Sequence, residues 1–387
     1  MKILYVTTVS LTLNTFLIPH IKYLIENGNE VQIASNIDVE LSNEFTDRKI
    51  KHTRIDFSRN PFSLNNKKAY KQIIELQKSE KFDIIHVHTP VASFVTRLAL
   101  RNYDVKMIYT AHGFHFYEGA PLINWLLYYP LEKIAARWTD TLVTINSEDL
   151  KRAKTFKLRN NGRVELMHGV GISPNVYELS NFDKNEYREL LGLNKDDFII
   201  LILAELNKNK NHIQIIKAME ILKDKYPNIK ILCAGKGPLE NELKNKVKEL
   251  RLENNIKFIG FRNDIKELLN ISDCVGLFSM REGLGKCLLE GMITGKALIA
   301  TNTRGPKELI EDDRNGFLLD VGDYKTTAMY IEKLYLDHNK RISFATESKK
   351  KVKKYLLENV LQEIITFNLN NDDNNLCKSK KEIIDNI

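Results

Sequence analysis

Residues 197–237 read DFIILILAELNKNKNHIQIIKAMEILKDKYPNIKILCAGKG, and this stretch indicates the fold. Two short runs rich in isoleucine and leucine, 197–206 and 229–237, have the length and composition of buried strands. The segment between them predicts a helix that begins near His212. A strand, a helix and a second strand in this order are typical of a βαβ unit on a parallel sheet.

The same alternation of short β-branched runs and amphipathic segments continues along most of the chain. In the first half we expect strands at 2–8, 30–35, 83–89, 106–112, 141–147 and 163–169. In the second half we expect them at 197–206, 229–237, 255–261, 274–280, 297–302 and 316–320. Two sequential series predict an α/β protein with two Rossmann-like domains. Residues 173–195 carry Pro174, Asn175 and mixed charge, and they break the pattern, so we expect the linker there.

Length and composition agree with a two-domain globular protein. The 387 residues are too many for one ordinary core, and 43% hydrophobic with 28% charged residues is usual for a soluble chain. No apolar stretch reaches the roughly 18 residues of a membrane span, and the first residues resemble a strand more than a signal peptide. The four cysteines show no C-x-x-C spacing, which favours buried free thiols. We therefore expect a cytoplasmic protein.

The net charge of +8 admits nucleic acid, an anionic membrane surface, or a general excess of lysine. No recognition helix, zinc finger or aromatic RNA-binding strand motif is present, so we expect no nucleic-acid partner. A membrane contact is suggested by residues 112–138, because aromatic side chains favour the lipid interface and basic ones favour anionic head groups. The residues concerned are Trp125, Tyr128, Tyr129, Lys133 and Arg137, with Lys67, Lys68 and Lys71 as a second basic group. The alternative is an ordinary core helix.

Residues 279–296, SMREGLGKCLLEGMITGK, carry the strongest indication of chemistry. The turn Gly283-Leu284-Gly285 opens a helical run, and free N–H groups at a helix start can bind an anion such as a diphosphate. Glu282 precedes the turn and Glu290 lies about a turn and a half into the helix. Carboxylates accept paired hydrogen bonds from sugar hydroxyls. The alternative is that Glu282 caps a helix and Glu290 is solvated.

The Glu-x7-Glu arrangement, the EGLG turn and the following LLEGMITGKALIATNTRGPKELI resemble the donor-site segment of the retaining glycosyltransferases of family four. TAHGFHFYEGAPLINWLLYYPLEK and AELNKNKNH are similar to the bacterial capsule and exopolysaccharide branch of that family. The resemblance extends from Met1 to about Tyr355. It implies a GT-B fold, with two Rossmann-like domains facing across a cleft. The implied bounds are 1–176 for the acceptor-side domain, 177–352 for the nucleotide-sugar domain, and 353–387 for a returning helix and polar tail.

The same resemblance implies roles for individual residues. Glu282 contacts the transferred sugar, Glu290 the nucleotide ribose and His112 the donor sugar, while Lys210 neutralises the donor diphosphate. The remaining nucleotide-sugar-binding residues are Leu284, Gly285, Lys286, Lys208, Arg262 and Arg304. From position alone, His112 can equally be a packed histidine and Lys210 a solvated loop residue.

Three positions qualify the resemblance. An arginine usually stands where this chain has Glu205, and Lys208 or Arg304 can supply the missing charge. Residues 7–10, TTVS, lie where many relatives have a glycine pair, and their hydroxyls are candidates for a ligand contact. Residues 235–238, GKGP, resemble a family motif, but a simple strand-to-helix turn is the expected role.

The resemblance and the missing motifs together define an expected function. No Asp-x-Asp occurs, and His86 and His88 have no third ligand nearby in sequence, so we expect neither a metal nor a cofactor. The absence of nucleophile-elbow and phosphate-loop motifs argues against a hydrolase or a kinase.

We expect a metal-independent retaining transferase, peripheral to the inner face of the cell membrane. It would move sugar from a nucleotide donor, UDP-linked by expectation, to a membrane-borne glycolipid acceptor in capsule or exopolysaccharide biosynthesis. Two alternatives remain: a nucleotide-sugar epimerase on the same scaffold, and a non-catalytic binding subunit of a polysaccharide assembly complex. Glu205 favours the second alternative, whereas the intact set of Glu282, Glu290, Lys210 and His112 opposes it.

Overall fold

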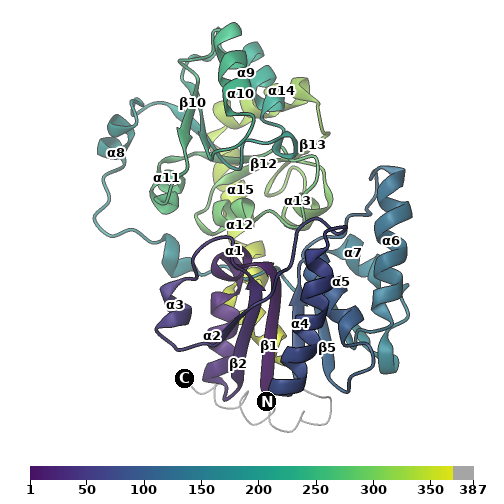
Figure 1. Ribbon diagram of the computed structural model, residues 1–387. Coiled ribbons are helices and arrows are strands. Elements are labelled where there is room, and N and C mark those ends of the chain that lie inside the picture. The colour runs from purple at the N-terminus through teal and green to yellow at the C-terminus, as the bar shows by residue number, and fades with distance from the viewer. Residues whose placement is uncertain (369–387) are drawn as a thin grey trace. The chain divides into compact units, whose positions relative to one another are not determined.

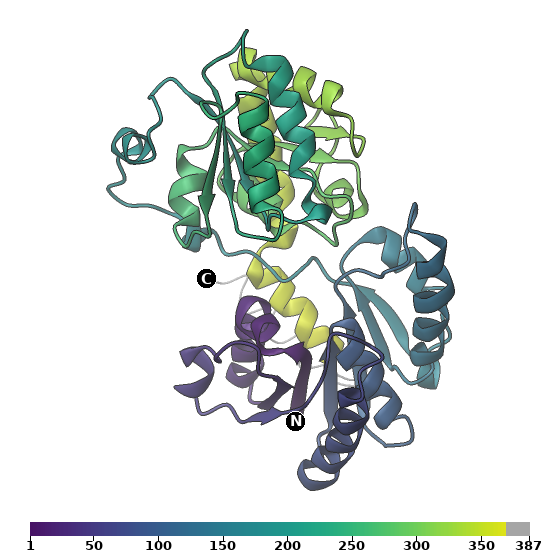
Figure 2. The same ribbon diagram turned by 45° about the horizontal axis from the view of Figure 1, so that its top comes forward.

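The structure is a computed structural model that describes residues 1–368. Residue contacts divide the chain into two compact units, each drawn in Figures 1 and 2. Unit 1 contains Met1–Gly171 together with the last described helix, and unit 2 contains Ile172–Leu356. The division therefore falls after 171 and after 356, whereas the sequence analysis placed it after 176 and 352.

Unit 1 is built on a seven-stranded parallel sheet with the strand order β3-β2-β1-β4-β5-β6-β7. The strands are β1 (Lys2–Val9), β2 (Glu30–Asn36), β3 (His52–Arg54), β4 (Ile84–His88), β5 (Lys106–Ala111), β6 (Thr141–Thr144) and β7 (Arg163–Leu166). The central strands are buried along almost their whole length, as expected for a parallel sheet covered on both faces. The six predicted strands are confirmed. β3 was missed because its sequence, His-Thr-Arg, has no apolar run.

Helices surround this sheet, and the last described helix belongs to the same unit. They are α1 (Ser10–Thr12), a π-helical turn (Leu13–Leu17), α2 (Ile18–Glu26), α3 (Asn43–Thr46), α4 (Asn65–Glu80), α5 (Pro90–Ala99), α6 (Leu122–Ala136), α7 (Ser147–Ala153), a 3-10 turn (Arg159–Asn161) and α16 (Leu357–Asn368). The Lys106 ammonium donates to the Asn368 carbonyl (2.9 Å), and the backbone N–H of His168 donates to Glu363 (2.9 Å). These hydrogen bonds attach α16 to unit 1, although it follows unit 2 in the sequence.

Unit 2 repeats the arrangement with six parallel strands in the order β10-β9-β8-β11-β12-β13. The strands are β8 (Phe198–Leu203), β9 (Ile229–Ala234), β10 (Ile256–Gly260), β11 (Cys274–Leu277), β12 (Ala297–Thr301) and β13 (Gly316–Leu319). All six correspond to predicted strands. Cys233, Cys274 and Cys287 are buried free thiols, as expected, and Cys377 lies outside the described residues.

The helices of unit 2 include two short ones in the expected linker. In chain order they are a 3-10 helix (Pro174–Tyr177), α8 (Lys184–Leu190), a 3-10 turn (Lys208–Lys210), α9 (His212–Leu222), α10 (Glu240–Glu249), α11 (Ile265–Ile271), α12 (Lys286–Ile293), α13 (Arg304–Leu309), α14 (Tyr324–Leu336), α15 (His338–Lys351) and a 3-10 helix (Val352–Tyr355). The linker segment therefore folds locally and is not simply extended. The polar tail expected within 353–387 lies outside the described residues beyond 368.

Both sheets reverse their strand order at one point. In unit 1 this happens between β1 and β4, and in unit 2 between β8 and β11. The connections on the two sides of such a point leave in opposite directions, which opens a crevice beyond the carboxyl ends of the strands. We therefore expect functional side chains in the loops that follow β1, β4, β8 and β11.

Candidate active site

In unit 2 the two loops at the reversal point meet through an ion pair. Lys210 ends the 3-10 turn that follows β8, and Glu282 lies in the loop after β11. The Lys210 Nζ is 2.6 Å from the Glu282 Oε2, and both side chains are largely buried. The structure therefore brings together the two residues that the sequence analysis assigned to the diphosphate and the transferred sugar.

Neighbouring polar groups hold this pair in place. The Asn209 side chain donates to the Arg281 carbonyl (3.0 Å), and the Met280 backbone N–H donates to the Asn209 carbonyl (2.8 Å). The Ser279 hydroxyl also donates to Glu282 (3.2 Å). Asn209 and Ser279 could not be identified from the sequence, because their contacts arise only where the two loops touch.

The ion pair keeps a positive charge at this position. Burial of Lys210 opposes its charged form, but the Glu282 carboxylate outweighs burial, so the pKa of Lys210 is raised above its usual value. Lys210 is therefore an ammonium throughout the physiological range. An ammonium at the carboxyl edge of a sheet can bind a phosphate oxygen.

The amino end of α12 lies directly after Glu282. Gly285 precedes the helix with φ +98°, in the left-handed region, and a Cβ there would be 3.0 Å from the Leu277 side chain. Glycine is therefore required at this turn. Among the residues that the structure describes, no side chain caps α12, so its first N–H groups stay available to an anion. Leu284 is buried beneath the turn, and Lys286 is exposed beside it.

Glu290 lies on α12 and is buried. It accepts a hydrogen bond from the Tyr177 hydroxyl (2.9 Å), and Lys286 Nζ is 3.7 Å away. Burial raises the pKa of the Glu290 carboxyl above its usual value. The alternative that Glu290 is a solvated helix residue is therefore wrong. The alternative that Glu282 caps a helix is also wrong for α12. Sequence reasoning missed Tyr177, which belongs to the linker segment.

The two arginines assigned to the nucleotide have different surroundings. Arg304 begins α13, is buried, and its Nε donates to the Glu282 carbonyl (3.4 Å). Arg262 follows β10 and forms an ion pair with Asp264, and its Nη2 also donates to the Tyr187 hydroxyl (3.2 Å). Arg304 therefore reaches the Glu282 loop, whereas the Arg262 guanidinium is paired within its own loop and with α8.

The loop after β8 also contains the unusual acidic residue. Glu205 is exposed and accepts a hydrogen bond from the Asn207 side chain (2.9 Å), and Lys208 is exposed in the same loop. A Cβ on Gly235 would be 2.0 Å from the Ala204 carbonyl oxygen, so the turn after β9 presses against this loop. This close approach agrees with the expected structural role of the GKGP turn.

In unit 1, His112 follows β5 and contacts a second histidine. Its Nε2 is 3.1 Å from the Nδ1 of His88, the last residue of β4, and the two rings stack with centroids 5.3 Å apart. His86 and Tyr5 extend this stack into the core. Burial lowers the pKa of His112 to about 4, so its ring is neutral near pH 7.

The structure thus places a third histidine beside His86 and His88, which sequence proximity did not reveal. The three rings stack on one another, however, and within residues 1–368 no group of three His, Cys, Asp or Glu side chains has an arrangement that could hold a metal ion. The histidine stack is therefore a packed polar column that ends at His112.

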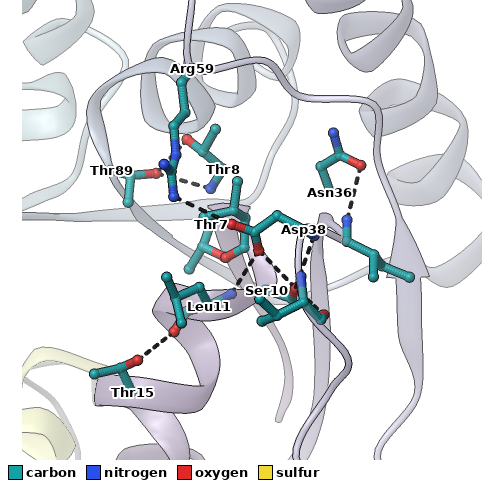
Figure 3. A network of polar contacts seen from close by, with 12 residues as sticks. Thr7, Thr8, Ser10, Leu11, Thr15, Asn36, Asp38, Arg59 and Thr89 are labelled. Carbon is teal, nitrogen blue, oxygen red and sulfur yellow. Dashed lines mark hydrogen bonds and ion pairs between the residues drawn. The ribbon is translucent and has the colours of Figure 1, made fainter. Parts of the chain in front are cut away.

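The loops near the reversal point of unit 1 carry several polar contacts (Figure 3). The Thr8 and Thr89 hydroxyls are 2.7 Å apart, and the Thr7 hydroxyl donates to the Val9 carbonyl (2.8 Å). The Ser10 hydroxyl donates to Asp38 (3.0 Å). Thr89 has φ +63°, which is strained for a β-branched residue and typical of functional loops. These hydroxyls therefore bond within unit 1, and a ligand would have to compete with those bonds.

Comparison with known proteins agrees with this picture. Family models described as "Glycosyl transferase 4-like" and "Glycosyl transferases group 1" match residues 2–147 and 183–351. The putative glycosyltransferase EpsD of Bacillus subtilis is 40% identical over 86% of this chain and 87% of its own length. UDP-Gal:alpha-D-GlcNAc-diphosphoundecaprenol alpha-1,3-galactosyltransferase of Escherichia coli is 30% identical, over 68% and 69%. The capsular polysaccharide biosynthesis glycosyltransferase CapM of Staphylococcus aureus is 26% identical, over 94% and 95%.

Among solved structures, HepE of Anabaena in complex with UDP and glucose superimposes with a TM-score of 0.79 at 21% identity, covering 95% of this chain and 98% of HepE. The two parallel α/β units and the similarity to HepE together define the GT-B fold of glycosyltransferases. The chain belongs to the group 1, or GT4-like, glycosyltransferase family. No helix within residues 1–368 combines the length and the apolar character needed to cross a bilayer.

Proposed function

We propose that this chain transfers a sugar from a UDP-linked donor to a lipid-linked saccharide with retention of anomeric configuration. The observation that carries the proposal is the Lys210–Glu282 ion pair beside the uncapped amino end of α12. It combines a cation, hydrogen-bond donors and a carboxylate, which are the groups that a sugar diphosphate requires. The complex of HepE with UDP and glucose, and the UDP-Gal donor of the Escherichia coli relative, support the choice of donor.

In this proposal unit 2 holds the nucleotide. Glu290 accepts hydrogen bonds from the ribose hydroxyls, and Lys210 with the first N–H groups of α12 binds the diphosphate. Gly285, Leu284 and Lys286 form the turn around it, Lys208 and Arg304 add positive charge, and Arg262 contacts the nucleotide base. When the diphosphate arrives, Lys210 gains a second anionic partner, and Glu282 exchanges part of its ion pair for sugar hydroxyls.

The transfer step needs no protein nucleophile. Glu282 and His112 orient the sugar, and the acceptor hydroxyl attacks the anomeric carbon from the face that the diphosphate leaves. The bond from that carbon to the phosphate oxygen breaks, and the acceptor proton passes to the departing phosphate oxygen. Lys210 and the helix N–H groups stabilise the charge that develops on the diphosphate. The proposal includes no metal ion and no cofactor.

The acceptor is proposed from the relatives. The Escherichia coli relative acts on a diphosphoundecaprenol-linked sugar, and CapM belongs to capsular polysaccharide biosynthesis. We therefore place this chain in capsule or exopolysaccharide biosynthesis, on a lipid-linked acceptor held by the inner face of the cell membrane. A peripheral contact with that membrane follows from the acceptor and agrees with the net charge of +8.

The first experiment is a panel of nucleotide sugars, measured as a shift in the melting temperature of the full chain. A bound ligand at one hundred times its Kd stabilises the folded state by about 2.7 kcal/mol, which such a shift detects. The stabilising donor is then incubated with diphosphoundecaprenol-linked saccharides, and the product anomer is read by NMR. A UDP-sugar isomerised without acceptor would indicate an epimerase. Binding without transfer to any acceptor would indicate a binding subunit.

A further inference from the structure

The helix α6 of unit 1 carries an aliphatic surface that nothing in the described chain covers. Leu122 is 81% exposed and Leu126 is 72% exposed. The other exposed aliphatic residues of the same helix are Ile123, Leu127, Leu131 and Ile134. Their spacing places all six on one side of a helix, and we call this surface the α6 face. Figure 1 shows α6 along the outer side of unit 1, beside α5.

The opposite side of α6 is fixed to the core by aromatic and charged side chains. The rings of Trp125 and Tyr129 lie 5.7 and 5.3 Å from that of Phe116. Glu132 forms an ion pair with Arg97 (2.9 Å), which is fully buried. Breaking such a pair would leave a buried charge without a partner, so the orientation of α6 is firmly set.

This orientation corrects one expectation of the sequence analysis. Trp125, Tyr128 and Tyr129 were expected at the lipid interface, but all three are partly buried and pack against the core of unit 1. The side chains that remain exposed are the aliphatic ones. A helix with an acidic residue inward and leucines outward is the reverse of an ordinary surface helix, and a contiguous apolar surface of this kind marks an interaction site.

The charges around the α6 face favour one partner. Lys133 and Arg137 are exposed at the carboxyl end of the helix, and Lys151 and Arg152 are exposed on α7. Arg152 lies over the Trp125 ring, 4.7 Å from its centroid, which places α7 beside α6. The nearby acidic residues are less exposed: Glu118 is exposed, but Glu148 is half-buried and accepts from the Glu118 N–H, Glu132 is paired inward, and Asp149 is buried and accepts from the Phe114 N–H. Apolar residues next to basic ones suit an anionic bilayer.

We propose that the α6 face lies in the interface of an anionic membrane and is the surface through which the protein reaches its lipid-linked acceptor. This proposal rests on the proposed function for the identity of the acceptor. α6 has 15 residues and one apolar side, so it lies along the membrane and does not cross it. Because α6 follows β5 through residues 113–121, its amino end is at the same edge of the sheet as His112.

The test uses the full chain and vesicles of phosphatidylcholine, with or without phosphatidylglycerol. The variant Leu122→Gln/Leu126→Gln/Leu127→Gln removes apolar area from the α6 face without touching its inner side. The matched control is Leu190→Gln/Leu336→Gln in unit 2, where the leucines of α8 and α14 are 75% and 64% exposed. The wild type should sediment with anionic vesicles, and the triple variant should bind them at least about tenfold more weakly. The control should bind like the wild type.

A second variant tests the charges. Lys133→Gln/Arg137→Gln should lower binding to anionic vesicles about tenfold or more and leave binding to neutral vesicles unchanged. All variants should melt close to the wild-type temperature, because the substituted side chains are exposed. A wild type that does not bind anionic vesicles, or an equal loss in the leucine control, overturns the proposal. So does a wild-type dimer that the triple variant converts to a monomer, since a second copy would then cover the face.

Transfer assays separate this proposal from the proposed function. The triple variant should keep its response to the nucleotide sugar and its turnover of a short-chain, water-soluble acceptor, and should lose turnover of a long-chain acceptor in vesicles. If the wild type binds vesicles through the α6 face but transfers sugar to neither acceptor, the membrane contact stands and the proposed function fails. If the triple variant loses turnover of the soluble acceptor as well, the α6 face has a different role.

Discussion

The ammonium of Lys210 and the carboxylate of Glu282 are 2.6 Å apart, although the two residues are separated by 72 positions in the sequence. They come from the loops after β8 and β11, the two strands at which the sheet of unit 2 reverses its order. The two groups therefore form one ion pair across these loops. Their proposed roles differ, and substitutions should separate them.

Lys210→Ala should reduce turnover by about 2–4 kcal/mol of transition-state stabilisation, as expected for the loss of one preorganised charge partner. Glu205→Ala is the control in the same loop and should be tolerated, because Glu205 is exposed and bonds only to Asn207 among the contacts described. Steady-state kinetics of both variants are measured with the nucleotide sugar that raises the melting temperature of the wild type. An inactive Glu205 variant together with a mild Lys210 variant would show that the phosphate site has been misplaced.

Glu282→Gln should reduce turnover roughly a hundredfold and change nucleotide affinity by only a few fold, because the carboxylate acts on the reacting sugar. Its amide keeps the shape of the side chain, so the loop after β11 should stay folded. Calorimetric titration with UDP and single-turnover rates give the two quantities. A loss of UDP affinity as large as the loss of turnover would contradict this role.

Glu290→Ala should weaken UDP binding, because the residue that is proposed to hold the ribose is removed. Tyr177→Phe should weaken it less, since it removes only the hydroxyl that donates to Glu290 (2.9 Å) and leaves the carboxylate in place. Each lost hydrogen bond to a charged group is worth about 1.5–3 kcal/mol. UDP titrations into the two variants provide the comparison. Unchanged UDP affinity in Glu290→Ala would remove the residue from the nucleotide site.

Activity should persist in excess EDTA. In the proposed mechanism Lys210 and the N–H groups of α12 supply the positive charge that a metal ion supplies elsewhere. Rates are compared with and without chelator, and a magnesium or manganese add-back is the control. Activity that disappears in EDTA and returns with either metal would refute this part of the mechanism.

The buried histidines of unit 1 should make stability fall in mild acid. Burial lowers the pKa of His86 to about 3, and of His20 and His112 to about 4. Below pH 6.5 the unfolded chain therefore binds more protons than the folded one, so the free energy of unfolding decreases as the pH falls from about 6.5 toward 4. Each such histidine contributes up to about 1.4 kcal/mol per pH unit.

Urea unfolding at several pH values measures how steeply the free energy of unfolding falls with pH. In His86→Gln this slope should be smaller by the contribution of one histidine. The substitution removes a group that is buried and hydrogen-bonded to Thr110 (2.7 Å), so overall stability should also decrease. An unchanged slope in the variant would show that His86 does not contribute to the acid sensitivity.

Much of the fold could be predicted because its signals are local. Buried parallel strands are rich in apolar and β-branched residues, and all twelve predicted runs contain strands. Within residues 1–368, β3, with the polar sequence His-Thr-Arg, is the strand that was not predicted. The glycine turn before α12 was also readable, since glycine is required where φ is positive and a Cβ would touch Leu277.

Tertiary contacts decided what the local pattern could not. The sequence placed Glu290 on a helix, but only the packing of Tyr177 against α12 showed that its carboxylate is buried and hydrogen-bonded. In α6 the aromatic and acidic residues lie on one side and the aliphatic residues on the other, and either side could have faced the core. Arg97 is fully buried, and leaving its charge without a partner would cost far more free energy than exposing leucines. Because Glu132 of α6 pairs with Arg97, the aliphatic side of the helix faces outward.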